Sequence, residues 1–267
     1  MSKTAFISTA IPYVNARPHI GHALEFVQTD AMARYLRLTG HDTFSLTGSD
    51  ENSLKNVRAA QDEGISTREL CDRNTAIFQK LIPGLNLAVT DFIRTSSDLH
   101  IAGARQFWQR CRPEDVYKKH YSGLYCVGCE VFYPGDETGG VCPEHGTPLE
   151  LVEEENYFFK LSNYQDELVR LIESGELRIV PDAKRNETLS FVKGGLRDFS
   201  ISRSRKRAGD WGIEVPGDPS QVMYVWYDAL ANYITALDIS DEDGKFKKYW
   251  LNCPRRIHVI GKGINRF

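Results

Sequence analysis

The sequence lacks a strong charge of either sign, a long apolar run and any repeated or low-complexity segment. Its 33 lysines and arginines nearly balance 36 acidic residues, and the net charge of −3 provides no overall basic field for nucleic acid. No stretch approaches the ~20 apolar residues of a membrane helix, and residues 1–3 lack the apolar core of a signal peptide. These absences favour a globular protein with no membrane partner. We expect it in a reducing cytoplasm, where disulfides are rare.

The first 50 residues are typical of a parallel strand–helix–strand unit. Residues 5–9 predict a short strand, residues 20–38 predict a helix, and residues 41–47 predict a second, buried strand. A helix between two strands favours a parallel pair, and ligands of such sheets bind beyond the carboxyl ends of the strands. We therefore expect residues 11–15 and Asp50, which follow the two strands, to face one crevice.

The remaining sequence predicts a sheet domain that is interrupted once. Residues 117–159 are rich in aromatic and β-branched residues, which is typical of antiparallel hairpins. The predicted fold class is α/β, with a Rossmann-like parallel nucleotide-binding sheet interrupted by a mixed α+β insertion. Residues 1–113 would be the first part of the sheet domain, 114–221 the insertion and 222–267 the return. The other expected elements are helices beginning near 52 and 66, helices over 99–112, 163–173, 185–193 and 227–237, and strands over 91–95, 222–225 and 257–260.

Two histidines three residues apart stand at the start of the first predicted helix. His19 and His22 therefore share one side of its first turn. Helix N-termini carry unpaired N–H groups and a partial positive charge, so anions bind there, and an imidazole can donate a hydrogen bond to a phosphate. Gly21 would let a flat base approach the backbone. The alternative is a pair of surface histidines, and the position between strand and helix favours phosphate binding.

Four residues of the predicted insertion have the spacing of a zinc site. Cys126 and Cys129 are separated by two residues, as are Cys142 and His145. Each short gap lets a tight turn direct two ligands to one ion, and three cysteines with one histidine form a closed zinc set. A closed set predicts a structural Zn²⁺, in a zinc knuckle over residues 126–145. The alternatives are disulfides or unrelated buried cysteines. We expect the isolated Cys71, Cys111 and Cys253 to be ordinary buried residues.

These motifs carry a resemblance to a known family. His19-Ile20-Gly21-His22 after a strand resembles the nucleotide signature of class I aminoacyl-tRNA synthetases. The runs Ile11-Pro12-Tyr13-Val14-Asn15 and Thr47-Gly48-Ser49-Asp50-Glu51 resemble methionyl-tRNA synthetases, and the likeness extends from residue 4 to residue 267. It implies that ATP with Mg²⁺ activates methionine to methionyl-adenylate, and that the methionyl group is then transferred to tRNA(Met). The family also carries a zinc knuckle in its insertion.

The resemblance also implies a set of site residues. Asp50 at a strand end suits the substrate ammonium group, and aromatic side chains suit the apolar slot around its side chain. The Tyr13 hydroxyl could donate to a thioether and so reject leucine, although Trp226 and Tyr233 alone would be ordinary core residues. Positions matching the family's ATP site are Tyr13, Asn15, His19, Gly21, His22, Gly261 and Lys262, with His19 and His22 catalytic. Those matching its methionine site are Ile11, Tyr13, Asp50, Trp226, Tyr233, Ile264 and Phe267.

The chain departs from the family in three places. Asn52 and Ser53 stand where relatives usually have histidine and glycine, and Gly263 replaces an acidic residue that can hold the ribose. The family's Lys-Met-Ser-Lys-Ser loop and anticodon-binding domain are absent from this sequence, so we expect the chain alone to activate methionine poorly. The alternatives are a sister class I synthetase for cysteine, isoleucine or leucine, and a non-catalytic zinc-containing tRNA-binding fragment. The sequence leaves the oligomeric state open.

Overall fold

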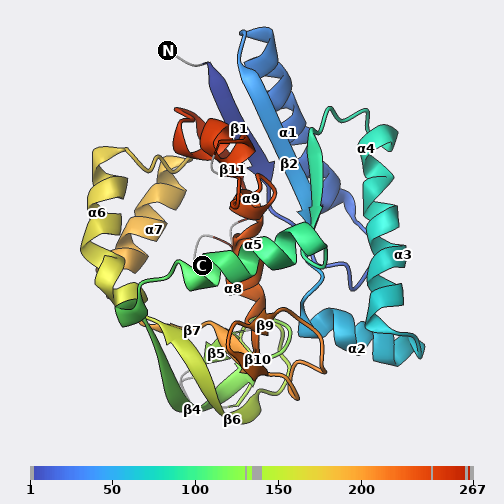
Figure 1. Cartoon of the computed structure of the whole chain (residues 1–267), viewed down its shortest axis with the longest axis vertical. Helices are drawn as coiled ribbons and strands as arrows, with labels where there is room; N and C mark the ends of the chain where they lie inside the picture. The colour runs from blue at the N-terminus through green and yellow to red at the C-terminus, as the bar shows by residue number, and fades with distance from the viewer. Residues whose placement is uncertain (1–2, 130, 134–139, 242, 262–263, 265–267) are drawn as a thin grey trace.

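A four-stranded parallel sheet forms the upper part of the molecule (Figure 1). The structure, a computed structural model, describes residues 3–129, 131–133, 140–241, 243–261 and 264. The sheet has the strand order β11-β1-β2-β3, and each neighbouring pair is parallel. This confirms the predicted parallel sheet. Its strands are β1 (Thr4–Thr9), β2 (Asp42–Ser49), β3 (Asp91–Arg94) and β11 (Arg256–Val259).

The strand order places a topological switch point beside β1. The chain proceeds from β1 to β2 on one side, whereas β11 pairs with β1 on the other side after the long excursion of residues 95–255. At the carboxyl end of the sheet, Thr9 Oγ1 lies 2.8 Å from Thr47 Oγ1, so β1 and β2 end side by side. Ligand crevices of open α/β sheets form at such points.

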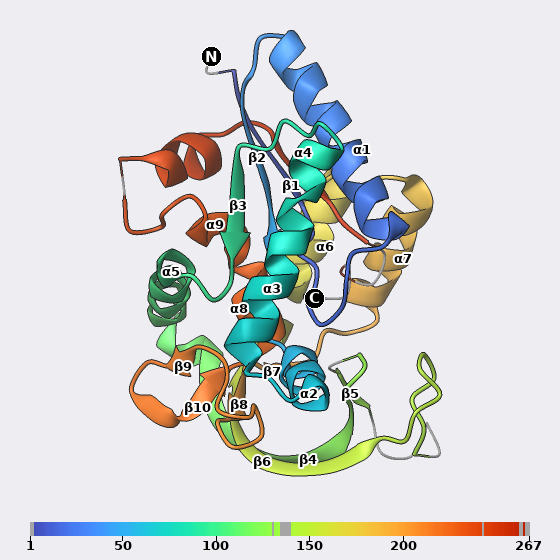
Figure 2. The same cartoon turned by 90° about the vertical axis from the view of Figure 1, so that its right-hand side faces the viewer.

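Helix α1 has the bounds that the sequence predicts, Ile20–Leu38. The His19 side chain caps its first turn, and Gly40, with φ +82°, adopts the left-handed conformation that ends helices. Ser66 caps α3 by accepting a hydrogen bond from the Glu69 amide. Figure 2 shows α1, α3 and α4 beside β1–β3. The other helices of this part are α2 (Leu54–Glu63), α3 (Thr67–Gln79), α4 (Leu81–Gly84) and α5 (Asp98–Gln109).

Two small antiparallel sheets lie below the parallel sheet, and two helices lie to its side (Figure 1). One sheet has the order β5-β4-β6-β7, and its antiparallel β4–β5 and β4–β6 pairs confirm the hairpins predicted over residues 117–159. The other sheet has the order β8-β10-β9 and is also antiparallel. The strands are β4 (Val116–Cys126), β5 (Val131–Tyr133), β6 (Glu150–Phe159), β7 (Phe199–Ser200), β8 (Ser202–Ser204), β9 (Glu214–Val215) and β10 (Asp218–Met223). The helices are η1 (Pro113–Asp115), η2 (Leu161–Tyr164), α6 (Gln165–Ser174) and α7 (Asp182–Lys193).

The prediction of one continuous helix over residues 227–237 is wrong. The structure has two short helices there, α8 (Val225–Leu230) and α9 (Asn232–Thr235). The Asn232 side chain donates to the Ala229 carbonyl at 2.6 Å, and a side chain that bonds a nearby carbonyl competes with the helical hydrogen-bond ladder. A π-helical turn, Lys247–Leu251, follows before β11.

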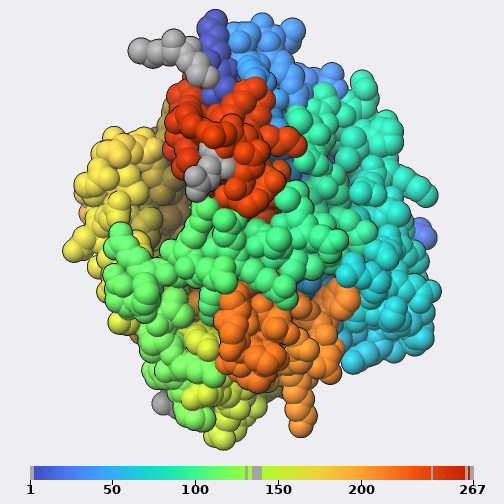
Figure 3. Space-filling model, in the orientation of Figure 1, coloured from blue at the N-terminus to red at the C-terminus, as the bar shows by residue number. Residues whose placement is uncertain are grey.

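Helix α5 joins the upper and lower halves. On the face seen in Figure 3 it crosses the middle of the molecule, with the C-terminal segment above it and the β8–β10 region below. Arg110, after its last turn, donates to the Ile239 carbonyl at 3.3 Å, and its residues Ala104 and Trp108 pack against Ile213 of the lower half. The described residues include no helix that is both long and apolar enough to cross a membrane.

Candidate active site

The segment after β1 and the segment after β2 meet at the carboxyl edge of the sheet, as predicted. Tyr13 and Asp50 form an isolated parallel bridge, and the Asp50 amide donates to the Pro12 carbonyl at 2.8 Å. The Asn56 side chain donates to the Asp50 carbonyl at 3.0 Å. These backbone bonds hold the buried Asp50 side chain in a fixed place next to Tyr13.

His19 and His22 are fixed by reciprocal hydrogen bonds at the start of α1. His19 Nδ1 accepts from the Gly21 amide at 3.1 Å, and His22 Nδ1 accepts from the His19 amide at 3.2 Å. When the rings are neutral, their protons are therefore on Nε2, which is left to donate to a ligand. Burial, and secondarily the charge of His19, lowers the pKa of His22. Neutral imidazole donors at a helix N-terminus suit a phosphate group.

One cavity of about 450 Å³ brings most of the predicted site residues together. Positions predicted for the amino acid and positions predicted for the phosphates border one space at the switch point of the sheet. The predicted residues that line it are Ile11, Tyr13, Asn15, His19, His22, Asp50, Trp226, Tyr233, Gly261 and Ile264. Gly21 is not a lining residue, although its amide donates to the His19 ring. Lys262, Gly263 and Phe267 lie outside the described residues.

Aromatic rings form the apolar wall of this cavity. The Tyr13 and Trp226 rings meet edge to face, with their centroids 6.4 Å apart, and Lys55 Nζ lies 4.6 Å from the Tyr13 ring centre. Trp226 and Tyr233 also border a second, largely apolar cavity of about 1380 Å³ between α5, α7 and the insertion strands. These two rings therefore separate two cavities instead of filling a closed core.

Sequence reasoning missed three polar residues that line the first cavity: Arg17, Glu25 and Asn232. Glu25 Oε1 accepts from the Ala10 amide at 2.6 Å, and burial raises the pKa of this carboxyl while that hydrogen bond opposes the shift. Glu25 stands three residues after His22, on the same side of α1, so helical spacing from His19 and His22 was the signal that could have found it.

A second carboxylate, Glu51, supports the neighbourhood of Asp50 from behind. It is fully buried and accepts hydrogen bonds from Arg94 at 2.7 and 3.0 Å and from Thr75 at 2.7 Å. Burial by itself would raise the pKa of Glu51, but Arg94 and the surrounding hydroxyls hold it below its ordinary value. Glu51 is thus a satisfied structural anion outside the cavity lining, whereas Asp50 and Glu25 are the carboxylates among the described residues that line the cavity.

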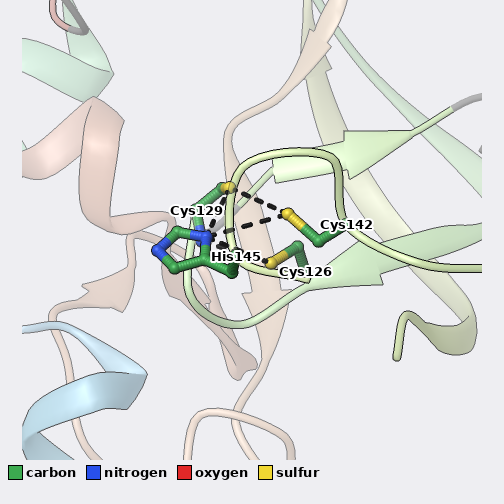
Figure 4. Close-up of side chains that lie close together, drawn as sticks. All are labelled: Cys126, Cys129, Cys142 and His145. Atoms are coloured by element: carbon green, nitrogen blue, oxygen red, sulfur yellow. Dashed lines mark hydrogen bonds between the residues drawn. The ribbon is translucent and has the colours of Figure 1, made fainter. Parts of the chain in front are cut away.

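The four predicted metal ligands converge in the insertion. Their ligand atoms all lie within 4.8 Å of one another (Figure 4). Cys129 Sγ lies 3.2 Å from His145 Nδ1 and 3.5 Å from Cys142 Sγ, and the Cys129 amide donates to Cys126 Sγ at 3.4 Å. Three sulfurs and one imidazole nitrogen at these separations fit the donor set of a tetrahedral zinc site.

The fold and the cavity define a nucleotide-binding type of α/β protein, with its site at the switch point of a parallel sheet. A family model described as tRNA synthetases class I (M) matches residues 5–150 and 144–267. These matches extend over nearly the whole sequence. The chain belongs to this family of class I tRNA synthetases.

Individual relatives agree with the family match. The chain is 49% identical over 268 residues to the methionine–tRNA ligase of Brucella suis biovar 1 (strain 1330), covering 98% of this chain and 51% of the relative. It is 43% identical over 272 residues to that of Mycobacterium tuberculosis (strain ATCC 25618 / H37Rv), covering 99% and 51%. The chain thus spans about half the length of these curated relatives.

Solved structures give the same picture. The chain superposes on Mycobacterium tuberculosis methionyl-tRNA synthetase in complex with methionyl-adenylate with a TM-score of 0.92 and 42% identity. This match covers 100% of the chain and 52% of that structure. The free state of the same enzyme gives a TM-score of 0.81 at 40% identity.

Proposed function

We propose that this chain is a catalytic portion of a methionine–tRNA ligase, with ATP and methionine bound in the cavity at the switch point. The observation that carries this proposal is the placement of Asp50, His19 and His22 around one cavity beside Trp226. An anionic group, a pair of phosphate donors and an apolar wall are what an amino acid and ATP require when they react. The relative solved with methionyl-adenylate supports the same pair of substrates.

The first step of the proposed reaction is an in-line displacement at phosphorus. A carboxylate oxygen of methionine bonds to the α-phosphorus of ATP, and the bond from that phosphorus to pyrophosphate breaks, so pyrophosphate leaves with the electron pair. Mg²⁺ bound with ATP would offset part of the phosphate charge. The chain's contribution is positioning and charge stabilisation. His19 and His22 donate to the phosphate as its charge grows, and Asp50 holds the methionine ammonium group.

The other cavity residues have supporting roles in this proposal. Tyr13 donates its hydroxyl to the thioether, Trp226 and Tyr233 enclose the side chain, and Ile11 and Ile264 complete the apolar slot. Asn15 and Gly261 lie on the nucleotide side, and Gly21 leaves room for the base. Lys262 and Phe267 keep the roles that the family resemblance gives them. The methionyl group would then pass to the 3′-terminal adenosine of tRNA(Met), with release of AMP.

The insertion has a structural role in this proposal. We assign residues 1–113 and 222–267 to the catalytic domain and residues 114–221 to a connective insertion. Cys126, Cys129, Cys142 and His145 would hold a structural Zn²⁺, which fixes the tip of that insertion. All six cysteines are free thiols, as a thiolate metal site requires, and we propose a reducing cytoplasm as the location.

The test is a fluorescence titration of the folded, zinc-loaded chain with methionine, using isoleucine and cysteine as controls. Trp226 at the cavity should make the emission change saturably with methionine alone. A response to isoleucine or cysteine instead would favour a sister synthetase. A chain that binds tRNA but none of the three amino acids would favour a non-catalytic RNA-binding fragment.

A further inference from the structure

Asp228 is a buried carboxylate on α8 that does not line the cavity. Its neighbours Trp226 and Ala229 line the cavity, whereas Asp228 is fully buried among other polar groups. Asn52 Nδ2 donates to Asp228 Oδ2 at 3.0 Å, and His100 Nε2 lies 3.4 Å from Asp228 Oδ1. Asn52 is thus the hydrogen-bond donor to Asp228 Oδ2, and the His100 ring lies against Oδ1 at ion-pair distance without hydrogen-bond geometry. Because burying a carboxylate without a partner is costly, the Asn52 contact restricts where α8 can lie.

Asn52 connects this carboxylate to the segment that carries Asp50. The same Asn52 Nδ2 donates to the Thr95 carbonyl at 3.0 Å, and the Thr95 hydroxyl accepts from the Glu51 amide at 2.8 Å. Asn52 therefore belongs to a rigid turn that begins at Asp50. Its second hydrogen bond reaches across 176 residues of sequence to α8. The Asn52 amide thus links the turn that begins at Asp50 to α8, which carries Trp226.

His100 secures the other side of Asp228. His100 lies on α5, is fully buried and has Nδ1 2.8 Å from the hydroxyl of Thr235 on α9. A Cβ atom at Gly103, one turn further along α5, would lie 2.7 Å from Thr235 Cγ2, so α5 and α9 are in close contact. The network of Asn52, Asp228, His100 and Thr235 thus joins helices α5, α8 and α9 and the turn after β2 behind the cavity.

The aromatic wall borders open space. Trp226 is half-buried and lines both cavities, of about 450 and about 1380 Å³. Where a wall borders open space, directional hydrogen bonds fix its position better than packing does, and the buried polar groups behind α8 supply such bonds. We propose that Asn52 and Asp228 are positioning residues that set the width of the methionine pocket. They do so by fixing the separation of the Asp50 carboxylate and the Trp226 ring, an inference that rests on the proposed function.

The test compares methionine with ethionine, which is longer by one methylene group, by calorimetry on the 267-residue chain. We expect Asn52→Ala to weaken methionine binding by about tenfold, the effect of losing one hydrogen bond to a charged group. The preference for methionine over ethionine should also fall at least threefold, because the Trp226 ring is no longer held at one distance from the Asp50 carboxylate. Asn52→Asp, which keeps the size but replaces the donor by an acceptor, should act in the same direction. Asp228→Asn should do so too.

The matched control is Asp115→Asn. Asp115 is also buried and accepts hydrogen bonds from Asn163 at 2.8 Å and from Tyr164 at 2.5 Å, but it lines neither cavity. The Asp115→Asn variant should have a lower melting temperature but the same ratio of methionine to ethionine affinity as the wild type. If Asn52→Ala behaves like Asp115→Asn, the network is structural only and the proposal is overturned.

A second measurement keeps the network testable without any ligand. In a ¹⁵N-tryptophan-labelled chain, Trp226→Phe identifies the Trp226 indole resonance, and Asn52→Ala should shift that resonance while Asp115→Asn should not. If the wild-type chain binds no methionine, the proposed function fails for this chain. An unshifted indole resonance in Asn52→Ala overturns the positioning role itself, even if methionine binds. Asn52 is only half-buried, so its alanine variant tests the idea even where Asp228→Asn does not fold.

Discussion

The imidazole rings of His19 and His22 are stacked at the N-terminus of α1, with their centroids 3.8 Å apart. At this distance a positive charge on His19 opposes a positive charge on His22. The pKa of His22 is lowered first by burial and second by His19. The charge of His19 therefore contributes to the protonation of His22, and this can be measured.

Replacing His19 by glutamine should raise the pKa of His22 without restoring it fully, because burial, the larger cause, remains. ¹H–¹³C NMR titration of the histidine Cε1–H signals measures this directly. The folded pKa lies below the ordinary value of about 6.5, so the unfolded chain binds the proton first as the pH falls. Stability contributed by neutral His22 is therefore lost below about pH 6.5, and His19→Gln should reduce that loss.

His41→Gln is the matched control, since His41 follows the other end of α1 and interacts with Thr39. It should leave the His22 titration unchanged. An unchanged His22 pKa in His19→Gln would mean that the two rings are electrostatically independent.

Replacing Gly21 by alanine tests the space beside the histidines. The new Cβ would lie 2.9 Å from His19 Cε1, so the His19 ring must move. Alanine is also the better helix residue by up to about 1 kcal/mol, so the melting temperature should not fall. We therefore expect several-fold weaker ATP binding in an undamaged fold, measured by calorimetry. Gly84→Ala, where a Cβ meets no atom within 4 Å, should leave ATP affinity unchanged. Equal affinities for the two variants would rule out a role for the His19 position.

Helix α1 and its neighbours were predictable from sequence, since their signals are local. Residue 19 as a cap and Gly40 with a positive φ fix the ends of the helix, and the short apolar run Ala5-Phe6-Ile7 marks β1. Because parallel strands share a carboxyl edge, the meeting of Tyr13 and Asp50 followed from the strand assignments alone. The family resemblance supplied further residues, and it also guided the interpretation of Trp226 and Tyr233.

Features that depend on contacts between distant segments were not predictable. The hydrogen bond from Asn52 to Asp228 joins residues 176 positions apart, and no local pattern marks either partner. Arg203 belongs to a basic cluster that resembles a solvated face, yet it is buried, with its guanidinium 3.8 Å from the Tyr224 ring centre. At the break between α8 and α9, the Asn232 side chain donates a hydrogen bond to the Ala229 carbonyl. Helix propensities do not include such a side-chain hydrogen bond, which competes with those of the helix.

Replacing Asp50 by asparagine should weaken methionine binding by roughly 10- to 100-fold, because a hydrogen bond to a charged group contributes about 1.5–3 kcal/mol. The side chain keeps its size, so the surrounding backbone bonds should persist. Calorimetry measures the dissociation constant. Asp72→Asn, which removes a carboxylate that pairs with Arg94 away from the cavity, is the control and should bind methionine like the wild type. Wild-type affinity in Asp50→Asn would exclude Asp50 as the ammonium partner.

Replacing Tyr13 by phenylalanine removes one hydroxyl and keeps the ring beside Trp226. If that hydroxyl donates to the thioether, methionine binding should weaken by about 0.5–1.5 kcal/mol while leucine binding stays the same. Competition between the two amino acids in the fluorescence titration measures the change in preference. Tyr35→Phe removes a hydroxyl from an exposed ring on α1 and should change neither affinity. An unaltered preference in Tyr13→Phe would assign selectivity to the shape of the wall.

Replacing Cys142 by serine should abolish zinc binding and destabilise the insertion. Serine is a poor zinc ligand, and a structural zinc site contributes its binding free energy directly to folding. Elemental analysis should find about one zinc per wild-type chain and almost none in the variant, with a lower melting temperature by circular dichroism. A chelator should lower the wild-type melting temperature toward that of the variant.

Cys111→Ser is the control for this prediction. Cys111 is half-buried and its Sγ lies 3.1 Å from the Tyr227 hydroxyl, away from the four converging ligands. It should keep its zinc and respond to the chelator as the wild type does. Methionine affinity should fall little in Cys142→Ser, because Cys142 lies at the tip of the insertion and lines neither cavity. Zinc retained at one per chain in Cys142→Ser would mean that the ion is held elsewhere. A large loss of methionine affinity would mean that the insertion shapes the cavity as well as stabilising itself.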